Sequence, residues 1–311
     1  MDSYKNRELV KVAYYYYKKE LTQNEISKKM GMSRQRVNRL LKKAREKGIV
    51  KIQIADVEKY DFELETKLEE KFNLKESVVT FSIDDENVTL DLGIAGAKYL
   101  EELVEKGDMI GVTWGRTLSE VAMRLSDHKD YEMPVVQLVG GMNIAYTALK
   151  PDEITRTIAE KFGGTPYLLY SPASVENKET KDAIMSDNSI KKTFNMMEKC
   201  NIIVVGIGEL TKDSTLYTQK YFNEKYISHL VELGCVGDIG FGWYDKNGNV
   251  VKHDYLDRTI GYDIFENKND ALVVAVAGEE KKYEAILGAL RGNFIDVLIT
   301  DRNMAQKLVE T

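Results

Sequence analysis

Side chains with the chemistry to read a DNA base edge are concentrated in residues 34–43. Arginine can donate two hydrogen bonds to guanine O6 and N7, and asparagine or glutamine can pair with adenine N6 and N7. At about 100° per residue, a helix over residues 34–45 separates two faces. Its apolar face carries Val37, Leu40, Leu41 and Ala44. Its opposite face carries Gln35, Arg39 and Lys42, flanked by Arg34, Arg36 and Asn38.

This pattern predicts a recognition helix, whose N-terminal half normally meets base edges while its flanks meet phosphates. We therefore expect a set of residues in the major groove: Ser33, Arg34, Gln35, Arg36, Asn38 and Arg39. The DNA backbone is expected to meet Lys42, Lys43 and Lys51, and Thr22 completes the predicted DNA-binding set. Which groove residue touches a base stays open.

Two preceding helices must position this one. Leu9, Val12, Ala13, Tyr16 and Tyr17 fall at helical spacing and predict a first helix that buries them. The tyrosine run 14–17 could instead stack on single-stranded bases. We favour the buried stripe, which leaves Tyr14 and Tyr15 partly exposed.

The capping box T-Q-N-E at 22–25 predicts the start of the second helix, and Gly31 can end that helix with a positive φ. Ser33 can cap the third helix, and Gly48 ends it. Residues 49–54 alternate like a strand. Helix, tight turn and helix predict a winged helix-turn-helix domain over residues 1–54.

The distribution of charge agrees with a nucleic-acid partner. The 311 residues carry a net charge of −6, but residues 1–54 hold fifteen Lys and Arg against five Asp and Glu, a net charge of +10. The remaining residues hold 29 basic and 45 acidic side chains, a net charge of −16. A basic module of this kind is the electrostatic footprint of DNA binding.

Residues 55–311 form the second predicted domain. Residues 55–75 predict a connecting helix, which could contact a second subunit or pack on its own domain. Apolar runs then alternate with helical stretches, which predicts a Rossmann-like, mostly parallel α/β sheet with helices on both sides. The runs are residues 78–83, 109–112, 135–139, 167–170, 202–207, 272–277 and 297–300, and helical stretches include 90–104, 117–125 and 282–290.

Several protein classes are disfavoured. Only Cys200 and Cys235 are present, which suggests reduced thiols in a cytoplasm. Three widely spaced histidines make a zinc site improbable, and we expect no metal and no cofactor. No apolar run approaches the roughly 18–20 residues of a membrane span, and the N-terminus lacks a signal core. We expect a cytoplasmic protein without a membrane partner.

The chain resembles the SorC family of bacterial sugar-responsive transcription regulators. Residues 14–52 look like that family's DNA-binding domain. The likeness continues through IGVTWGRTL at 110–118, VVQLVGGM at 135–142, VVGIGEL at 204–210, GCVGDIG at 234–240, WYDKNGNVV at 243–251 and residues 275–301. The resemblance implies a double-stranded DNA operator, a homotetramer and an effector domain similar to phosphosugar isomerases, which binds a phosphorylated sugar or sugar alcohol.

The predicted effector site begins where a strand leads into a helix at 113–117, because such a loop offers backbone N–H groups to a phosphate. Its residues are Thr113, Trp114, Gly115, Arg116 and Thr117. The resemblance adds a second loop, Gly140, Gly141, Met142 and Asn143. It also adds Asp238 as a partner for sugar hydroxyls and Lys282 as a residue that approaches the ligand.

Two departures from the family narrow the ligand. Val139 stands where the deoxyribonucleoside-responsive branch has a lysine bonded to its ligand and the glycolytic-gene branch has an arginine on a second phosphate. Valine can do neither, which favours a monophosphorylated ligand. Glu279 replaces a common glycine and makes its loop less favourable to an anion.

An enzyme is disfavoured, because we find no nucleophile elbow, metal-ligand set or defensible acid and base pair, and fold alone does not give function. Gly206-Ile207-Gly208 lacks the third glycine of a dinucleotide fingerprint. The alternative that stays open is a DNA-binding architectural protein with a ligand-free, isomerase-like dimerisation domain.

Overall fold

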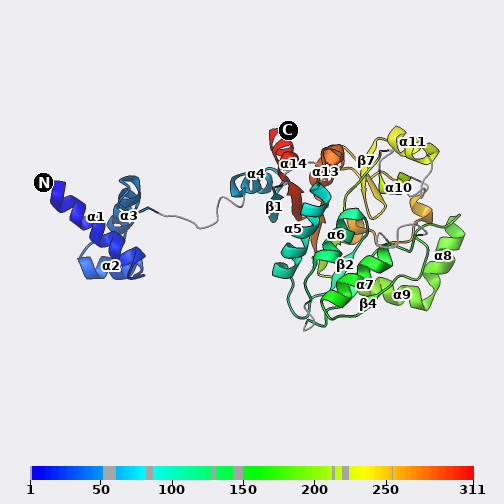
Figure 1. Ribbon diagram of the computed structural model, residues 1–311, viewed down its shortest axis with the longest axis horizontal. Coiled ribbons are helices and arrows are strands. Elements are labelled where there is room, and N and C mark those ends of the chain that lie inside the picture. Colours follow the sequence, from blue (N-terminus) through cyan, green and yellow to red (C-terminus); the bar gives the residue numbers. More distant parts are fainter. Residues whose placement is uncertain are drawn as a thin grey trace. The chain divides into compact units, whose positions relative to one another are not determined.

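The computed structural model describes residues 2–51, 61–81, 87–127, 131–142, 150–211, 214–218, 224–253 and 255–311 (Figure 1). The chain divides into two compact units, Met1–Lys59 and Tyr60–Thr311. Each unit has hydrophobic clusters of its own.

The first unit is helical. It contains α1 (Asp2–Tyr17), α2 (Gln23–Met30) and α3 (Arg34–Glu46). The predicted capping box forms: the Thr22 side chain accepts from the Glu25 N–H, and the Glu25 carboxylate accepts from the Thr22 N–H. Gly31 ends α2 with a φ of 63°. The three helices meet in a small core of four buried residues, Val12, Ile26, Val37 and Leu41.

The prediction that Tyr16 and Tyr17 are the buried members of the tyrosine run is wrong. Tyr16 and Tyr17 are exposed, at 36% and 37% of their surface, whereas Tyr15 packs against the core of α1, α2 and α3. Tyr15 lies three residues after Val12 and joins its cluster. Tyr16 and Tyr17 follow the face of Ala13, whose cluster with Leu9, Ala44, Ile49 and Val50 does not include them.

The segment after α3 also differs from the expectation. The strand predicted over 49–54 is absent from its described part, 49–51, and residues 52–54 lie outside the described residues. Ile49 and Val50 instead pack against Leu9, Ala13 and Ala44, because the Ile49 and Val50 N–H groups both bond to the Ala44 carbonyl after the helix ends.

Of the connecting helix predicted over 55–75, the structure describes α4 (Phe62–Phe72), which packs on its own unit. Leu68 is fully buried, Lys71 donates to the Val309 carbonyl, and Arg302 pairs with Asp61 at 3.0 Å. Of the two readings left open for this segment, packing on its own domain is the one observed. Val57 and Tyr60, which fall within the predicted connecting helix, lie outside the described residues.

All seven apolar runs form strands of one parallel sheet, in the order β1-β10-β9-β5-β2-β3-β4. The strands are β1 (Glu76–Thr80), β2 (Ile110–Val112), β3 (Val135–Gln137), β4 (Pro166–Tyr167), β5 (Ile202–Val205), β9 (Leu272–Val276) and β10 (Val297–Asp301). In the middle of the sheet, Gly111 of β2 stands opposite Ile203 on one side and Val136 on the other.

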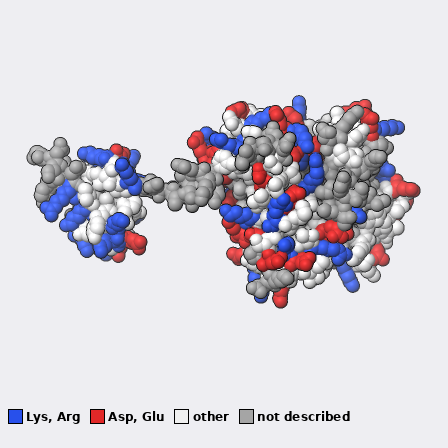
Figure 2. Space-filling view, viewed as in Figure 1, with Lys and Arg blue, Asp and Glu red and all other residues white. Residues whose placement is uncertain are grey.

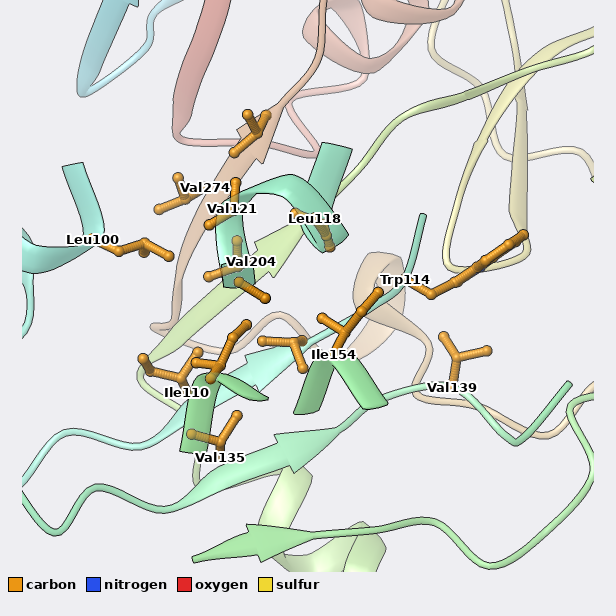
Figure 3. Packing of buried hydrophobic residues seen from close by; sticks show 14 of the residues in the cluster. Leu100, Ile110, Trp114, Leu118, Val121, Val135, Val139, Ile154, Val204 and Val274 are labelled. Carbon is orange, nitrogen blue, oxygen red and sulfur yellow. The ribbon is translucent and has the colours of Figure 1, made fainter. Parts of the chain in front are cut away.

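Helices cover both faces of this sheet, as predicted. One core contains buried residues of α5 (Val88–Leu103), α6 (Arg116–Arg124) and α7 (Pro151–Lys161), with Ile110, Val204 and Val274 from the strands (Figure 3). The other core contains residues of α4, α9 (Asn188–Met197), α13 (Tyr283–Arg291) and α14 (Arg302–Glu310), with Ile203 and Val273. Neighbouring strand residues thus enter opposite cores, which explains the continuous apolar runs.

A second, smaller sheet was not predicted. It is antiparallel, with β7 (Cys235–Ile239) between β6 (Gly208–Glu209) and β8 (Gly242–Asp245). The remaining helices are α8 (Lys178–Ser186), α10 (Thr215–Thr218), α11 (Glu224–Glu232), α12 (Ile264–Asn267) and the 3-10 turns η3 (Leu256–Arg258) and η4 (Glu280–Lys282). Within the ranges described, no helix combines the length and apolar character needed to cross a bilayer.

Candidate DNA interface and effector site

Helix α3 presents the predicted reading face to solvent. Val37, Leu41 and Ala44 are buried against the first two helices, and the intervening side chains are exposed: Arg34, Gln35, Arg36, Asn38, Arg39, Lys42 and Lys43. Ser33 caps the helix, because its Oγ accepts from the Arg36 N–H at 3.2 Å. On the visible face of the first unit, Lys and Arg side chains are more prominent than Asp and Glu side chains (Figure 2).

One member of the predicted groove set is already engaged. The Arg36 guanidinium pairs with the Glu8 carboxylate of α1 at 2.9 Å, and the two side chains are 52% and 28% exposed. This exposed pair holds the arginine beside α1, and exposed pairs of this kind contribute about 1 kcal/mol or less. The other donors of the half-exposed Arg36 guanidinium stay available to DNA, but the pair directs the side chain toward Glu8.

A shallow groove lies at the start of α2. Thr22, Gln23, Asn24 and Arg34 line it together with the end of α1. Thr22 is thus both the cap of α2 and a neighbour of Arg34, and the N-terminus of a helix is where backbone N–H groups favour a phosphate.

The second unit has a cavity at the carboxyl edge of the parallel sheet. Thr113 follows β2 and Gly206 follows β5, and these neighbouring strands bring the two loops together. The Thr113 N–H donates to the Val204 carbonyl, and the Gly206 N–H donates to Thr113 Oγ1 at 3.4 Å. The lining residues are Thr89, Thr113–Leu118, Gly206–Glu209, Ser214, Leu216, Asp238, Gly240, Glu279 and Lys282.

The start of α6 supplies the donor end of this cavity. Gly115 is the N-cap, with a φ of 124°, and no side chain caps the helix. Only glycine adopts such a backbone readily. The first N–H groups of the helix are therefore left without a side-chain acceptor and carry the positive end of the helix dipole. Arg116 is exposed beside them, whereas Thr113 and Thr117 are buried.

Asp238 supplies the acceptor end. It lies on β7 and is 4% exposed, and its Oδ2 accepts from the Phe241 N–H at 3.1 Å. Burial raises the pKa of Asp238 to about 6, against the opposing effect of the Phe241 hydrogen bond, and nearby Glu209 raises it further while Lys282 lowers it. Phe241 stacks on Trp114 with the ring centroids 6.1 Å apart, which ties this turn to the 113–117 loop.

Glu209 and Lys282 face each other in the same cavity. Lys282 Nζ lies 3.9 Å from Glu209 Oε2, and the side chains are only 13% and 5% exposed. The neighbouring Lys281 pairs instead with Glu279 at 2.9 Å. Burial alone would raise the pKa of Glu279, but the hydrogen bond from Thr89 and the Lys281 contact outweigh it, and that pKa lies below its usual value.

The predicted second loop lies elsewhere. Gly140 bonds to the Ile260 carbonyl, Gly141 bonds to the Ser171 carbonyl, and Met142 is buried in the core that contains Ile110. None of the three lines the cavity. Asn143 lies outside the described residues. Val139 is fully buried and pairs with Gly261.

Of the residues predicted for the effector site, Thr113–Thr117, Asp238 and Lys282 line one cavity. Several other lining residues were not predicted. Glu209 follows Gly206 and Gly208, directly after a predicted strand, and the carboxyl-edge argument applied to the 113–117 loop would have found it. Thr89 and Ser214 carry no comparable signal. Within the described ranges, no cluster of His, Cys, Asp and Glu suits a metal ion.

Comparison with known proteins adds the family. Residues 58–310 match the family Sugar-bind, "Putative sugar-binding domain", and residues 5–47 match Sigma70_r4, "Sigma-70, region 4". The chain is 33% identical over 311 residues to the deoxyribonucleoside regulator of Bacillus subtilis, with 99% of each chain covered. It is 29% identical to the sorbitol operon regulator of Klebsiella pneumoniae, with 98% of each covered.

A solved structure agrees over nearly the whole chain. The full-length sorbitol operon regulator SorC from Klebsiella pneumoniae superposes with a TM-score of 0.76 at 30% identity, covering 97% of this chain and 98% of that one. The chain belongs to the SorC family. The family resemblance and the fold class are confirmed. As a SorC-family member, the chain is a DNA-binding transcription regulator controlled by a small effector, and the relatives named here are regulators.

Proposed function

We propose that this regulator binds a phosphorylated sugar or sugar alcohol in the cavity between the start of α6 and Asp238. The observation that carries the proposal is the cavity's two ends: uncapped helix N–H groups at Gly115–Thr117, and a buried carboxylate at Asp238. A phosphate suits the first end because the helix N-terminus is positive. Sugar hydroxyls suit the second because a carboxylate accepts their hydrogen bonds.

Lys282 is the second cation for the phosphate. It is 13% exposed and lines the cavity, and its ammonium is not hydrogen-bonded to Glu209 at a separation of 3.9 Å. Glu279, whose carboxylate is held by Thr89 and Lys281, leaves Lys282 available for the ligand. The second loop, Gly140, Gly141, Met142 and Asn143, remains a prediction from the family resemblance: the first three do not line this cavity, and Asn143 lies outside the described residues.

The relatives support this class of ligand without identifying its member. They include a sorbitol operon regulator and an erythritol catabolism regulatory protein, both named for polyol metabolism, beside the deoxyribonucleoside regulator. Val139 lies fully buried in this chain, where neither a covalent lysine nor a phosphate-gripping arginine is available. A monophosphorylated polyol or sugar fits these conditions.

The output of the regulator is a change in its affinity for a double-stranded operator. A single helix-turn-helix makes few base contacts, so we propose that the protein binds paired half-sites as a homo-oligomer. We propose a cytoplasmic homotetramer that consists of two dimers. The effector acts by binding one arrangement of this oligomer more tightly than another, and it can shift operator affinity only by that difference.

A thermal-shift screen tests the proposal. The probes are inorganic phosphate, ribose 5-phosphate, glucose 6-phosphate, glucitol 6-phosphate and the unphosphorylated parent of each sugar or polyol. A ligand at one hundred times its Kd stabilises a protein by about 2.7 kcal/mol, so the matching probe should raise Tm by about 5–10 °C. If a parent sugar or polyol shifts Tm as strongly as its phosphate, the phosphate assignment fails. If no probe shifts Tm, the architectural alternative gains support.

A further inference from the structure

A second acidic residue stands in the acceptor end of the cavity. Glu209 lies on β6, directly beside β7, where the ladder pairs Gly208 with Asp238 and Glu209 with Gly237. Its side chain is 5% exposed and lines the cavity. It is thus as deeply buried as Asp238, from a different strand of the same small sheet.

The two oxygens of this carboxylate have different surroundings. Oε2 faces Lys282 Nζ at 3.9 Å. Oε1 is sealed from solvent and has no hydrogen-bond donor among the described residues. Leaving a buried acceptor unsatisfied is costly, by about 1–3 kcal/mol and more for a charged group. Because Glu209 lines the cavity, a rotation of its carboxylate group brings this unpartnered oxygen to a ligand hydroxyl that can donate to it.

The charged side chains of the cavity indicate which part of the ligand binds next to Glu209 and Asp238. The buried side chains at this end are two carboxylates, Glu209 and Asp238, against one ammonium, Lys282. A phosphate placed next to both carboxylates would be repelled, whereas hydroxyl groups would donate to both. The uncapped start of α6 offers the phosphate a site without such acids.

We propose that Glu209 is a specificity-determining residue of the effector site, whose Oε1 accepts a hydrogen bond from a hydroxyl group of a polyhydroxylated ligand. This inference rests on the proposed function and extends it: the effector carries hydroxyls for both Glu209 and Asp238, apart from the anionic group that meets Lys282 and the start of α6. Glu209 acts on the hydroxyl end, and it is not a partner of the phosphate.

The test separates the two ends of the ligand. Isothermal titration calorimetry at pH 7.5 measures binding of inorganic phosphate, which probes the anionic end alone, and of whichever sugar or polyol phosphate binds wild type in the screen above. Glu209→Gln should weaken the sugar or polyol phosphate by about tenfold or more, since hydrogen bonds to charged groups contribute about 1.5–3 kcal/mol. The same substitution should leave inorganic phosphate bound at least as tightly, because a nearby negative charge is removed.

A structural role for Glu209 predicts another pattern. If the residue only held Lys282 in place, Glu209→Gln would weaken both probes by the same factor, and that result would overturn the proposal. Unchanged affinity for the sugar or polyol phosphate would overturn it as well. Glu209→Asp keeps the charge but shortens the reach, so it should show the same selective loss and serves if the glutamine variant folds poorly. Glu232→Gln, an exposed carboxylate on α11, is the matched control and should change neither affinity.

Failure of the proposed function gives a distinct outcome. If wild type binds none of the sugar or polyol phosphates, the ligand class is wrong, and the inference about Glu209 falls with it. If wild type binds one of them and both Glu209 variants bind it equally well, the ligand class stands and the role of Glu209 alone is refuted.

Discussion

Gly208 of β6 faces Asp238 of β7 so closely that a Cβ atom at Gly208 would lie 2.1 Å from Asp238 Oδ1. The glycine therefore creates the space in which the carboxylate sits. Gly208→Ala should displace Asp238, destabilise the protein by about 1–3 kcal/mol as overpacking does, and abolish the effector response. Denaturant unfolding and ligand titration measure the two effects.

Gly206→Ala is the matched control for stability, because its Cβ would make ordinary contacts, 3.4 Å from the Trp114 carbonyl oxygen and 4.0 Å from Leu118 Cγ. It should cost less than about 1 kcal/mol. Equal destabilisation by the two substitutions would refute the assigned role of Gly208.

The buried Asp238 also makes stability depend on pH. Burial raises its pKa from 3.8 to about 6, so the folded state binds this proton more tightly than the unfolded state. The resulting stabilisation is fully present below about pH 4 and is lost as pH rises through about 6. Between pH 4.5 and 7.5, wild type should lose about 2 kcal/mol of unfolding free energy relative to Asp238→Asn, which cannot titrate. Parallel pH profiles for the two proteins would contradict the shifted pKa.

Effector binding should have the opposite pH dependence. A hydroxyl donates to the ionised Asp238, and protonation weakens this interaction because it removes the negative charge and turns one of the two acceptor oxygens into a donor. We expect the affinity of wild type for its sugar or polyol phosphate to fall as pH drops below about 6, as measured by calorimetry. The affinity of Asp238→Asn, already weak, should fall less steeply, because only protonation of the ligand's phosphate, with a second pKa of about 6, then acts on binding. An affinity that is constant from pH 5 to 7.5 in wild type would place the hydroxyl contact elsewhere.

On the DNA side, base reading and phosphate contact can be separated. At least one of Arg34→Ala, Gln35→Ala, Asn38→Ala and Arg39→Ala should cost about 1–3 kcal/mol on the operator and relax preference at a defined base pair. Lys42→Ala should weaken binding to all sequences alike and reduce the salt slope by about one. Fluorescence anisotropy against operator and mismatched duplexes at several salt concentrations distinguishes the two behaviours. A sequence-selective loss for Lys42→Ala, with an unchanged slope, would refute its assignment.

The Arg36–Glu8 ion pair leads to a further prediction about DNA affinity. Because Glu8 holds the Arg36 guanidinium at 2.9 Å, Glu8→Gln should release it, raise affinity for all duplexes and steepen the salt slope by up to about one. Double substitution Glu8→Gln with Arg36→Ala should remove the gain. If the gain persists without Arg36, it comes from the lost negative charge on Glu8 itself.

The parallel sheet was predictable because its strands are buried on both faces, and each of the seven apolar runs contains or overlaps one strand. The antiparallel sheet escaped prediction because β6 has two residues and β7 carries Gly237 and Asp238 amid its apolar positions, so neither shows a period. In the site, Asp238 and Lys282 came from the family resemblance. The carboxyl-edge argument could have placed Glu209 near the site, but its burial and its unsatisfied oxygen are properties of the folded chain.

The central claim is that effector binding at Asp238 changes the affinity of the protein for its operator. The most direct measurement titrates a preformed complex with a labelled operator, selected from random duplexes, with the sugar or polyol phosphate that binds wild type. Wild type should show a ligand-dependent change in operator Kd, and Asp238→Asn should bind the operator with the wild-type Kd but show no change on adding ligand. A response of Asp238→Asn with wild-type potency would contradict the account.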